Sequence, residues 1–433
     1  MSPDERDRGP WTDDPFPRPS ATEATRRWLL LRRLARDAGA RAIVVAGHAG
    51  GTAEVQHLAN VAVRWESLLV ASVDEEPPLL LLQLDNHAAG AADWSSVAIA
   101  VTGPQLAEAA ARHVAGWLRP GDPVAILGPR SERVAMALRA ALEGHPIVDR
   151  GDAFLRARLV KGEEELAWVA WAATATDRAI VGFRADSRVG MREHELAALL
   201  SWHVARAGAQ PGICFLASAP ARGDGAVVPR QAPGRRQTGP GDLLTFELSA
   251  GMGGVTTQIL RTLALDGEAH PAAVRLHLVA DVCFAALLGT VRPGVDAAAL
   301  ETVGSSIIEG AGMTIVDDLV HGYGGGYLPP VLRTAGTRRA DPPDLPLRPG
   351  MLLVLQPNVV AADGRHGVQT GELVAVTDDG ARTFHATPRG LLAAAAASIA
   401  WPCRTSRGRC PDPMAGTPTC IRSRSAGPRP RVG

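Results

Sequence analysis

A histidine and two tyrosines frame a glycine-rich stretch, VHGYGGGYLPPVL, which occupies residues 320–332. The imidazole of His321 titrates near neutral pH, so it suits proton transfer, although it could serve only as a hydrogen-bond partner. Tyr323 and Tyr327, the two tyrosines of the chain, could each donate a hydroxyl to a substrate oxygen or could simply pack. The glycines do not join a predicted strand to a helix that carries a lysine, which disfavours a phosphate-binding loop. We therefore treat this stretch as a candidate catalytic loop.

Other chemical signals are absent from the sequence. No GxSxG, GxxxxGK[ST] or HExxH motif occurs, and the five cysteines are scattered without CxxC spacing. Cys214 lies in an apolar stretch, which is typical of a packing thiol. The cysteine pattern excludes a disulfide scaffold and fits a reducing cytoplasm, where we expect the protein to reside.

Composition excludes several partners. The 45 Lys and Arg residues balance the 45 Asp and Glu residues, so we expect no binding to nucleic acid. The apolar stretches are too short and too rich in alanine for a membrane span, so we expect no membrane contact. The first residues are charged and rich in proline, without the apolar core of a signal peptide.

The elements that must position the candidate loop fall into two regions. Across residues 21–152, short apolar strands such as RAIVVAG and DPVAILG alternate with amphipathic helices, which predicts an α/β domain. Across residues 153–401, long helices are followed by alternating strand-like segments such as LLTFELSA and GVQTGELVAVT, which predicts an α+β domain. We expect residues 1–20 and 402–433 to be disordered, because the tail is rich in Pro, Ser and Gly and carries seven Arg against one Asp.

Four stretches of the second region, in this order, resemble the pita-bread family. They are KGEEELAWVAWAATATDRAI, PGDLLTFELSAGMGGVTTQILRTL, HGYGGGYLPP, and LRPGMLLVLQPN followed by GVQTGELVAVTDDG. The family includes prolidase, aminopeptidase P, methionine aminopeptidase and the metal-free hydrolase creatinase. The resemblance implies an α+β fold in which a creatinase-like α/β domain precedes a curved antiparallel sheet backed by helices. It also implies a homodimer and an active site in the concave face of the sheet.

In the metalloenzymes of this family, two Asp, one His and two Glu hold a pair of divalent ions. The resemblance places these five positions at Glu247, Gln258, Gly325, Gln356 and Gly371. Neutral amides are weak ligands and glycine offers no side chain, so we expect neither a metal pair nor any other cofactor. The creatinase alternative also lacks its base, because the loop GDGAVVPRQAPGRRQTGPGD contains no histidine.

Three residues remain as candidates for catalysis by side chains alone. His321 matches the outer, substrate-contacting histidine of the family loop, and Glu247 and Glu372 are the carboxylates left near the ligand positions. The two carboxylates could form an acid/base pair or hold a cationic substrate, although Glu372 could equally point to solvent. As substrate-binding residues we predict Gln258, Tyr323, Gln356, Gln369 and Tyr327.

These residues support three hypotheses. The first is a metal-independent hydrolase or lyase acting on a C–N bond of a small polar amide, amidine or cyclic compound. The second is a catalytically inactive pita-bread protein that binds a small polar ligand or a short peptide. The third is a divergent metallo-aminopeptidase.

Overall fold

The computed structural model describes residues 18–394 except 49–52, 75, 129, 221–227, 267–268 and 325. All of the described residues belong to one compact unit. We predict residues 1–20 and 402–433 to be disordered, and all of them except 18–20 lie outside the described residues. Within 18–20, Ser20 caps the first described helix by accepting a hydrogen bond from the Glu23 amide.

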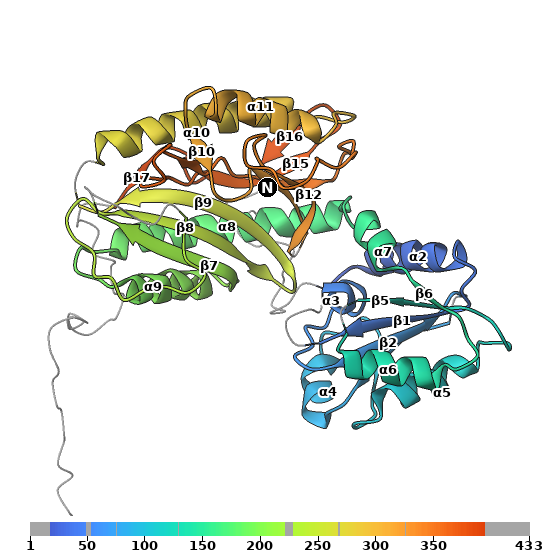
Figure 1. The fold of residues 1–433 in the computed structure, drawn as a ribbon. Helices are drawn as coiled ribbons and strands as arrows, with labels where there is room; N and C mark the ends of the chain where they lie inside the picture. Colours follow the sequence, from blue (N-terminus) through green and yellow to red (C-terminus); the bar gives the residue numbers. More distant parts are fainter. Residues whose placement is uncertain are drawn as a thin grey trace, which may run out of the picture. The chain divides into compact units, whose positions relative to one another are not determined.

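The N-terminal domain is a mixed sheet with helices on both faces (Figure 1). Its strands are β1 (Ala42–Gly47), β2 (Ser67–Ser72), β3 (Leu79–Leu82), β4 (Ala98–Val101), β5 (Val124–Leu127) and β6 (Ile147–Asp149). Their order in the sheet is β4-β3-β2-β1-β5-β6, with β1 antiparallel to β2 and parallel to β5. The helices are α2 (Ala21–Arg36), α3 (Ala53–Ala59), α4 (Asp85–Ala92), α5 (Leu106–Ala115), α6 (Glu132–Ala141) and α7 (Gly151–Ala157). The predicted α/β domain is therefore confirmed.

Alternation along the strands explains the layers of this domain. Ile43 and Val45 point toward α2, α3 and α7, whereas Val44 points toward α5 and α6. Strands that are buried on both faces read as continuous apolar runs, as RAIVVAG does. Phe154 of α7 packs in the first of these cores, so the N-terminal domain extends a few residues beyond 152.

The second domain contains a nine-stranded sheet, antiparallel except where β17 pairs with β9, that curls into a half-barrel (Figure 1). Its main strands are β7 (Gln210–Ala219), β8 (Leu243–Met252), β9 (Val255–Ala264), β11 (Val320–Tyr323), β12 (Tyr327–Leu332), β13 (Leu352–Leu355) and β15 (Gly371–Val376). They lie in the order β12-β11-β13-β15-β9-β8-β7, while β16 (Ala381–Thr383) and β17 (Leu392–Ala393) pair with β15 and β9. A separate pair is formed by β10 (Thr314–Ile315) and β14 (Val359–Val360).

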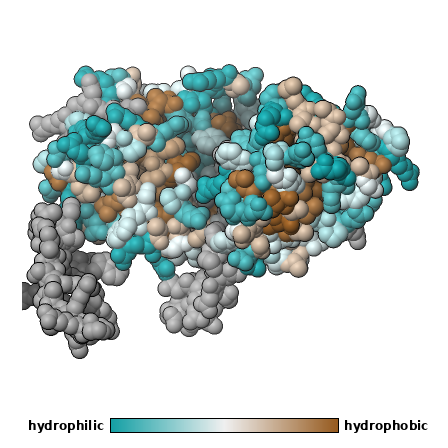
Figure 2. Space-filling model, turned by 90° about the horizontal axis from the view of Figure 1, so that it is seen from below, coloured by the Kyte–Doolittle hydropathy of each residue, from teal (hydrophilic) through white to brown (hydrophobic). Residues whose placement is uncertain are grey.

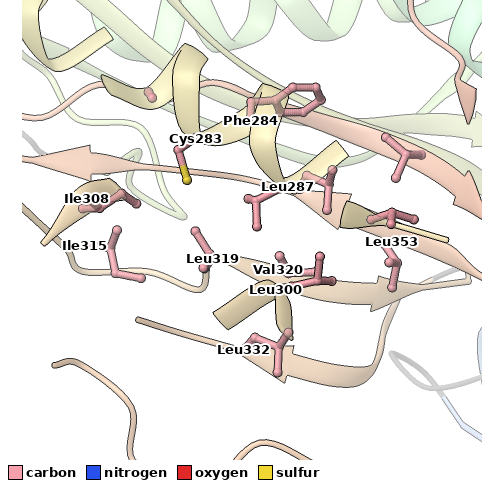
Figure 3. Close-up of a cluster of buried hydrophobic side chains, with 14 of the residues drawn as sticks. Cys283, Phe284, Leu287, Leu300, Ile308, Ile315, Leu319, Val320, Leu332 and Leu353 are labelled. Carbon is pink, nitrogen blue, oxygen red and sulfur yellow. The ribbon is translucent and has the colours of Figure 1, made fainter. Parts of the chain in front are cut away.

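Two helix pairs cover the same face of this curved sheet. Helices α8 (Glu163–Asp186) and α9 (Glu193–Arg206) pack on β7, β8 and β9. Helices α10 (Pro271–Thr290) and α11 (Ala298–Ile308) pack on β11, β13 and β15 through a buried cluster that includes Phe284, Leu287 and Leu353 (Figure 3). Full burial of such a side chain contributes about 1.5–3 kcal/mol. No pair of the described helices covers the opposite face, although Val169 of α8 reaches a small cluster on it, and this uncovered face is left to build a site.

Helix α10 is, among the described helices, the one that is long and apolar enough to cross a membrane. Its buried side consists of residues such as Leu276, Ala280 and Phe284, which pack on the sheet. We therefore interpret it as a core helix. On the face of the molecule drawn in Figure 2, hydrophobic side chains form separate patches among hydrophilic ones, a common pattern for a protein surface.

Candidate active site

Strand pairing brings Glu247 and Gln258 together on the uncovered face of the sheet. Glu247 of β8 lies opposite Leu260 of β9, and Ser249 lies opposite Gln258, so these four side chains point to one side. The Nε2 amide of Gln258 donates a hydrogen bond to Glu247 Oε1 at 2.5 Å. Both side chains are buried. The hairpin thus fixes one carboxylate oxygen of Glu247 and leaves the other for chemistry.

His321 lies on the same face, on the neighbouring part of the sheet. It stands opposite Val354 of β13, and its Nδ1 lies 3.0 Å from the carbonyl oxygen of Gly322. Nδ1 therefore carries the proton, and the buried Nε2 has no hydrogen-bond partner among the described residues. Burial lowers the pKa of His321, although the Gly322 carbonyl oxygen, Asp318 and the Gln356 side chain oppose the change, so the ring is neutral at pH 7 with Nε2 as its acceptor.

The glycine after this histidine is required by the fold. A Cβ atom on Gly322 would collide with the carbonyl oxygen of Pro329, because β11 and β12 approach closely at a register shift. The stretch therefore forms a tight loop between two strands, as predicted, and not a phosphate cradle at a helix start. Gly325, the position of the family's metal-binding histidine, lies outside the described residues.

The two tyrosines hold the histidine and the hairpin in place. The ring of Tyr327 stacks on His321 with centroids 3.9 Å apart, and its hydroxyl donates to Asp318 Oδ2 at 2.8 Å. The hydroxyl of the buried Tyr323 pairs with Thr256 Oγ1 at 2.7 Å. Both hydroxyls are thus bonded within the protein, which favours positioning over donation to a substrate.

Two aspartates beside the loop were missed by sequence reasoning. Asp317 and Asp318 directly precede β11 in the segment IVDDLVHGYG, and they carry no recognisable motif. Burial and, after it, the negative charges of Asp317 and Asp318 together raise the pKa of Glu247 to about 7. Burial also raises the pKa of Asp317. Glu247 therefore exchanges a proton near neutral pH, which is the property of an effective general acid or base.

Several buried amide atoms around this face have no hydrogen-bond partner among the described residues. Gln356 donates from Nε2 to the Asp318 carbonyl oxygen at 3.2 Å, but its Oε1 is unpartnered. The side-chain amides of Gln369 and Asn358 lack partners at both atoms, and so does Gln258 Oε1. Because buried polar groups in native proteins are almost always paired, these atoms indicate a place for a polar ligand or for water. The placement of Gln258, Gln356 and Gln369 agrees with a binding role.

Glu372 does not join Glu247. It lies opposite Ile259 of β9 and therefore shares the helix-covered face with Arg261, on the other side of the sheet. There it forms an ion pair with the fully buried Arg261 and a second pair with Arg389 at 3.3 Å. Glu372 thus neither points to solvent nor lines the candidate site, because the strand period of two turns it away. Its position favours a structural role in place of the predicted catalytic one.

An α/β domain followed by a curled antiparallel sheet with a polar site on its uncovered face defines a protein of the pita-bread class. Residues 169–378 match the family model of metallopeptidase family M24. The second domain of the chain therefore belongs to the M24 pita-bread family, and its resemblance to prolidase and aminopeptidase P is confirmed.

Known relatives span most of the chain. An Xaa-Pro dipeptidase from Pyrococcus furiosus is 23% identical over 238 residues, which cover 54% of this chain and 65% of the relative. The structure of X-Pro aminopeptidase from Thermotoga maritima MSB8 superposes with a TM-score of 0.73 at 18% identity, covering 86% of this chain and 99% of that one. The dipeptidase PepE from Mycobacterium ulcerans gives a TM-score of 0.71 at 21% identity, covering 87% and 100%. These similarities at low identity establish the fold of both domains.

The donors of this chain do not fit the two-metal centre of the family's metalloenzymes. Gln258 and Gln356 are neutral, and among the described residues no group of three or more His, Cys, Asp or Glu side chains is placed to hold a metal ion. Gly371 faces the site, opposite Leu260, but a Cβ there would lie 2.6 Å from the Leu355 carbonyl oxygen. Backbone from β13 thus fills the space that a ligand side chain would need.

Proposed function

We propose that the protein is a metal-independent hydrolase of the pita-bread family that cleaves a C–N bond in a small polar amide, amidine, cyclic compound or short peptide. The observation that carries the proposal is Glu247, a buried carboxylate that Gln258 holds by one oxygen on the same face of the sheet as the neutral His321. The relatives are named as a dipeptidase and an aminopeptidase, enzymes that cleave peptide C–N bonds, and these names support the proposed cleavage of a C–N bond.

Side chains alone can account for the steps of such a reaction. Ionised Glu247 would take a proton from water as the water oxygen attacks the carbonyl or amidine carbon. The protonated carboxyl would then give this proton to the leaving nitrogen as the C–N bond breaks. His321 Nε2 would accept a hydrogen bond from the substrate, and the amides of Gln356 and Gln369 would bind its polar atoms.

The experiment is a turnover screen with purified full-length protein. A panel of small amides, amidines, cyclic ureides and dipeptides is incubated with and without a strong chelator, and products are followed by mass spectrometry. We expect turnover that the chelator does not change, that Glu247→Gln abolishes and that His321→Ala lowers. The matched control is Glu108→Gln, which replaces an exposed carboxylate on α5. Turnover that disappears with chelator and returns with a divalent ion would refute the proposal.

A second function is favoured by the unpartnered amide atoms. If Glu247 does not act on the ligand, the same face would bind a polar molecule or peptide without turnover. Thermal-shift screening of the same panel separates the two functions, because ligands that stabilise the protein and are recovered unchanged indicate binding alone. We also propose that the protein acts as a cytoplasmic homodimer, which light scattering after size-exclusion chromatography tests.

A further inference from the structure

A polar cavity lies at the edge of the face that carries Glu247. Its volume is about 380 Å³, which is enough for a molecule the size of a dipeptide. Its walls come from the turn between β8 and β9, from Gly324 of the candidate loop, and from helices α2, α3 and α8 with the segment before α8. The ionisable or cationic side chains that carry the argument are Arg27, His57, Arg158, Lys161 and Glu165.

Two buried guanidinium groups in this cavity have unused donors. Arg27 and Arg158 are 3% and 8% exposed, and Arg27 Nη2 and Arg158 Nε have no hydrogen-bond partner among the described residues. Arg27 Nη2 approaches Glu165 only to 4.0 Å, and Arg158 donates from Nη2 to the Gly324 carbonyl oxygen at 3.3 Å. Buried N–H groups of a charged side chain are costly when unpaired, so these donors point to a ligand.

The charges around the cavity do not balance. Glu23 pairs with Arg27 at 2.6 Å, and Glu54 lies 3.6 Å from Arg158. Glu165 pairs with Arg26 at 2.9 Å and, at 4.0 Å, with Arg27, while Lys161 Nζ bonds only to the Arg158 carbonyl oxygen. Against the three carboxylates Glu23, Glu54 and Glu165 stand five cations, which leaves two positive charges; the cations are Arg26, Arg27, Arg64, Arg158 and Lys161.

Titration of the neighbouring groups agrees with this excess. Burial lowers the pKa of Lys161 to about 8; Glu165 opposes the change, and the positive charges of Arg158, Arg26 and Arg27 reinforce it. Burial, followed by the charges of Arg27, Arg158 and Lys161, also lowers the pKa of His57 well below its ordinary value. A bound anion would offset the repulsion that lowers both pKa values.

We propose that this cavity binds a small molecule through a single carboxylate, held by Arg27, Arg158 and Lys161. A guanidinium edge presents two parallel N–H donors, which match the two oxygens of a planar carboxylate. The cavity adjoins the Glu247 face, because Thr256 and Leu352 lie on that face, but the inference does not depend on the hydrolytic function. The cavity is linked to that face through Thr256, which lines it and is bonded to Tyr323.

Isothermal titration calorimetry of the full-length protein tests the site. The probes are N-acetylalanine, its neutral amide and inorganic phosphate, all at pH 7 and constant ionic strength. We expect N-acetylalanine to bind, the amide to bind at least about tenfold more weakly, and phosphate to bind more weakly than the acid. No binding of the acid, equal binding of acid and amide, or tighter binding of phosphate would overturn the proposal.

Variants locate the binding. Arg158→Gln and Lys161→Gln should each weaken N-acetylalanine at least about tenfold, whereas Arg112→Gln, an exposed change on α5, should not. If Arg158→Gln misfolds, Lys161→Gln still tests the site. Circular dichroism shows whether each variant is folded. Glu247→Gln should leave this affinity unchanged. Loss of binding on Glu247→Gln, or full affinity in both cavity variants, would place the ligand elsewhere and refute the inference.

Discussion

Replacement of Glu247 by glutamine should stabilise the protein at alkaline pH while removing its chemistry. The pKa of this carboxyl rises from an ordinary 4.5 to about 7 in the folded state. The folded protein therefore binds this proton more tightly than the unfolded chain does. Stability from this group is highest below pH 4.5, decreases as the pH rises from 4.5 to about 7, and is constant above that.

The size of the effect follows from the shift. A change of about 2.5 pKa units corresponds to about 3 kcal/mol, which is the penalty for holding Glu247 ionised in the folded protein at pH 8. Glutamine keeps the shape and can still accept the hydrogen bond from Gln258, but it carries no charge. Glu247→Gln should therefore be more stable than the parent at pH 8 by up to about 3 kcal/mol and nearly equal to it at pH 4.5.

Urea unfolding followed by tryptophan fluorescence measures this difference. Parent, Glu247→Gln and the exposed control Glu108→Gln are compared at pH 5 and pH 8, and the control should follow the parent at both. A Glu247→Gln variant that is less stable than the parent at pH 8 would refute the reasoning, because it would mean that a cation compensates the carboxylate.

Three further outcomes follow from the same structure. Glu372→Gln should lower the free energy of unfolding by about 3 kcal/mol in urea titrations, because it leaves the charge of the buried Arg261 without its main partner; a loss below about 1 kcal/mol would contradict this. Asp177→Asn should reduce stability more at pH 7 than at pH 2.5, by thermal unfolding, because hydrogen bonds from His385 and its neighbours lower the pKa of Asp177 despite burial, so its contribution decreases as the pH falls below about 3.8; an equal loss at both pH values would argue against it. Gly371→Glu, which restores the family's carboxylate, should unfold at lower temperature and gain no metal by elemental analysis, since β13 backbone fills the space.

Much of the fold could be predicted from the sequence because the patterns that indicate it lie within short segments or follow one another in a fixed order along the chain. The alternation in LLTFELSA predicted a strand of the second domain, and the resemblance placed Glu247 and Gln258 among the ligand positions, which the strand register brings to one face. Short elements such as α3, α4, β10 and β12 carry too few residues for a periodic signal, and they were missed.

The candidate site was less accessible to sequence reasoning because it depends on distant contacts. Asp317 and Asp318 affect the site only because β11 places them near Glu247, which lies about seventy residues earlier. The face of Glu372 is decided by pairing with β9, and its partner Arg261 lies 111 residues away. The alternation of side chains along a strand does not show which face points inward, because that depends on the pairing register.

Elemental analysis of the purified full-length protein tests the central claim most directly. The donor set of Glu247, Gln258 and Gln356 with Gly371 predicts far less than one manganese, cobalt, zinc or iron ion per chain after dialysis against metal-containing buffer, with turnover unchanged by chelator. About two tightly held ions per chain would show that the concave face retains a divalent pair and would contradict the account.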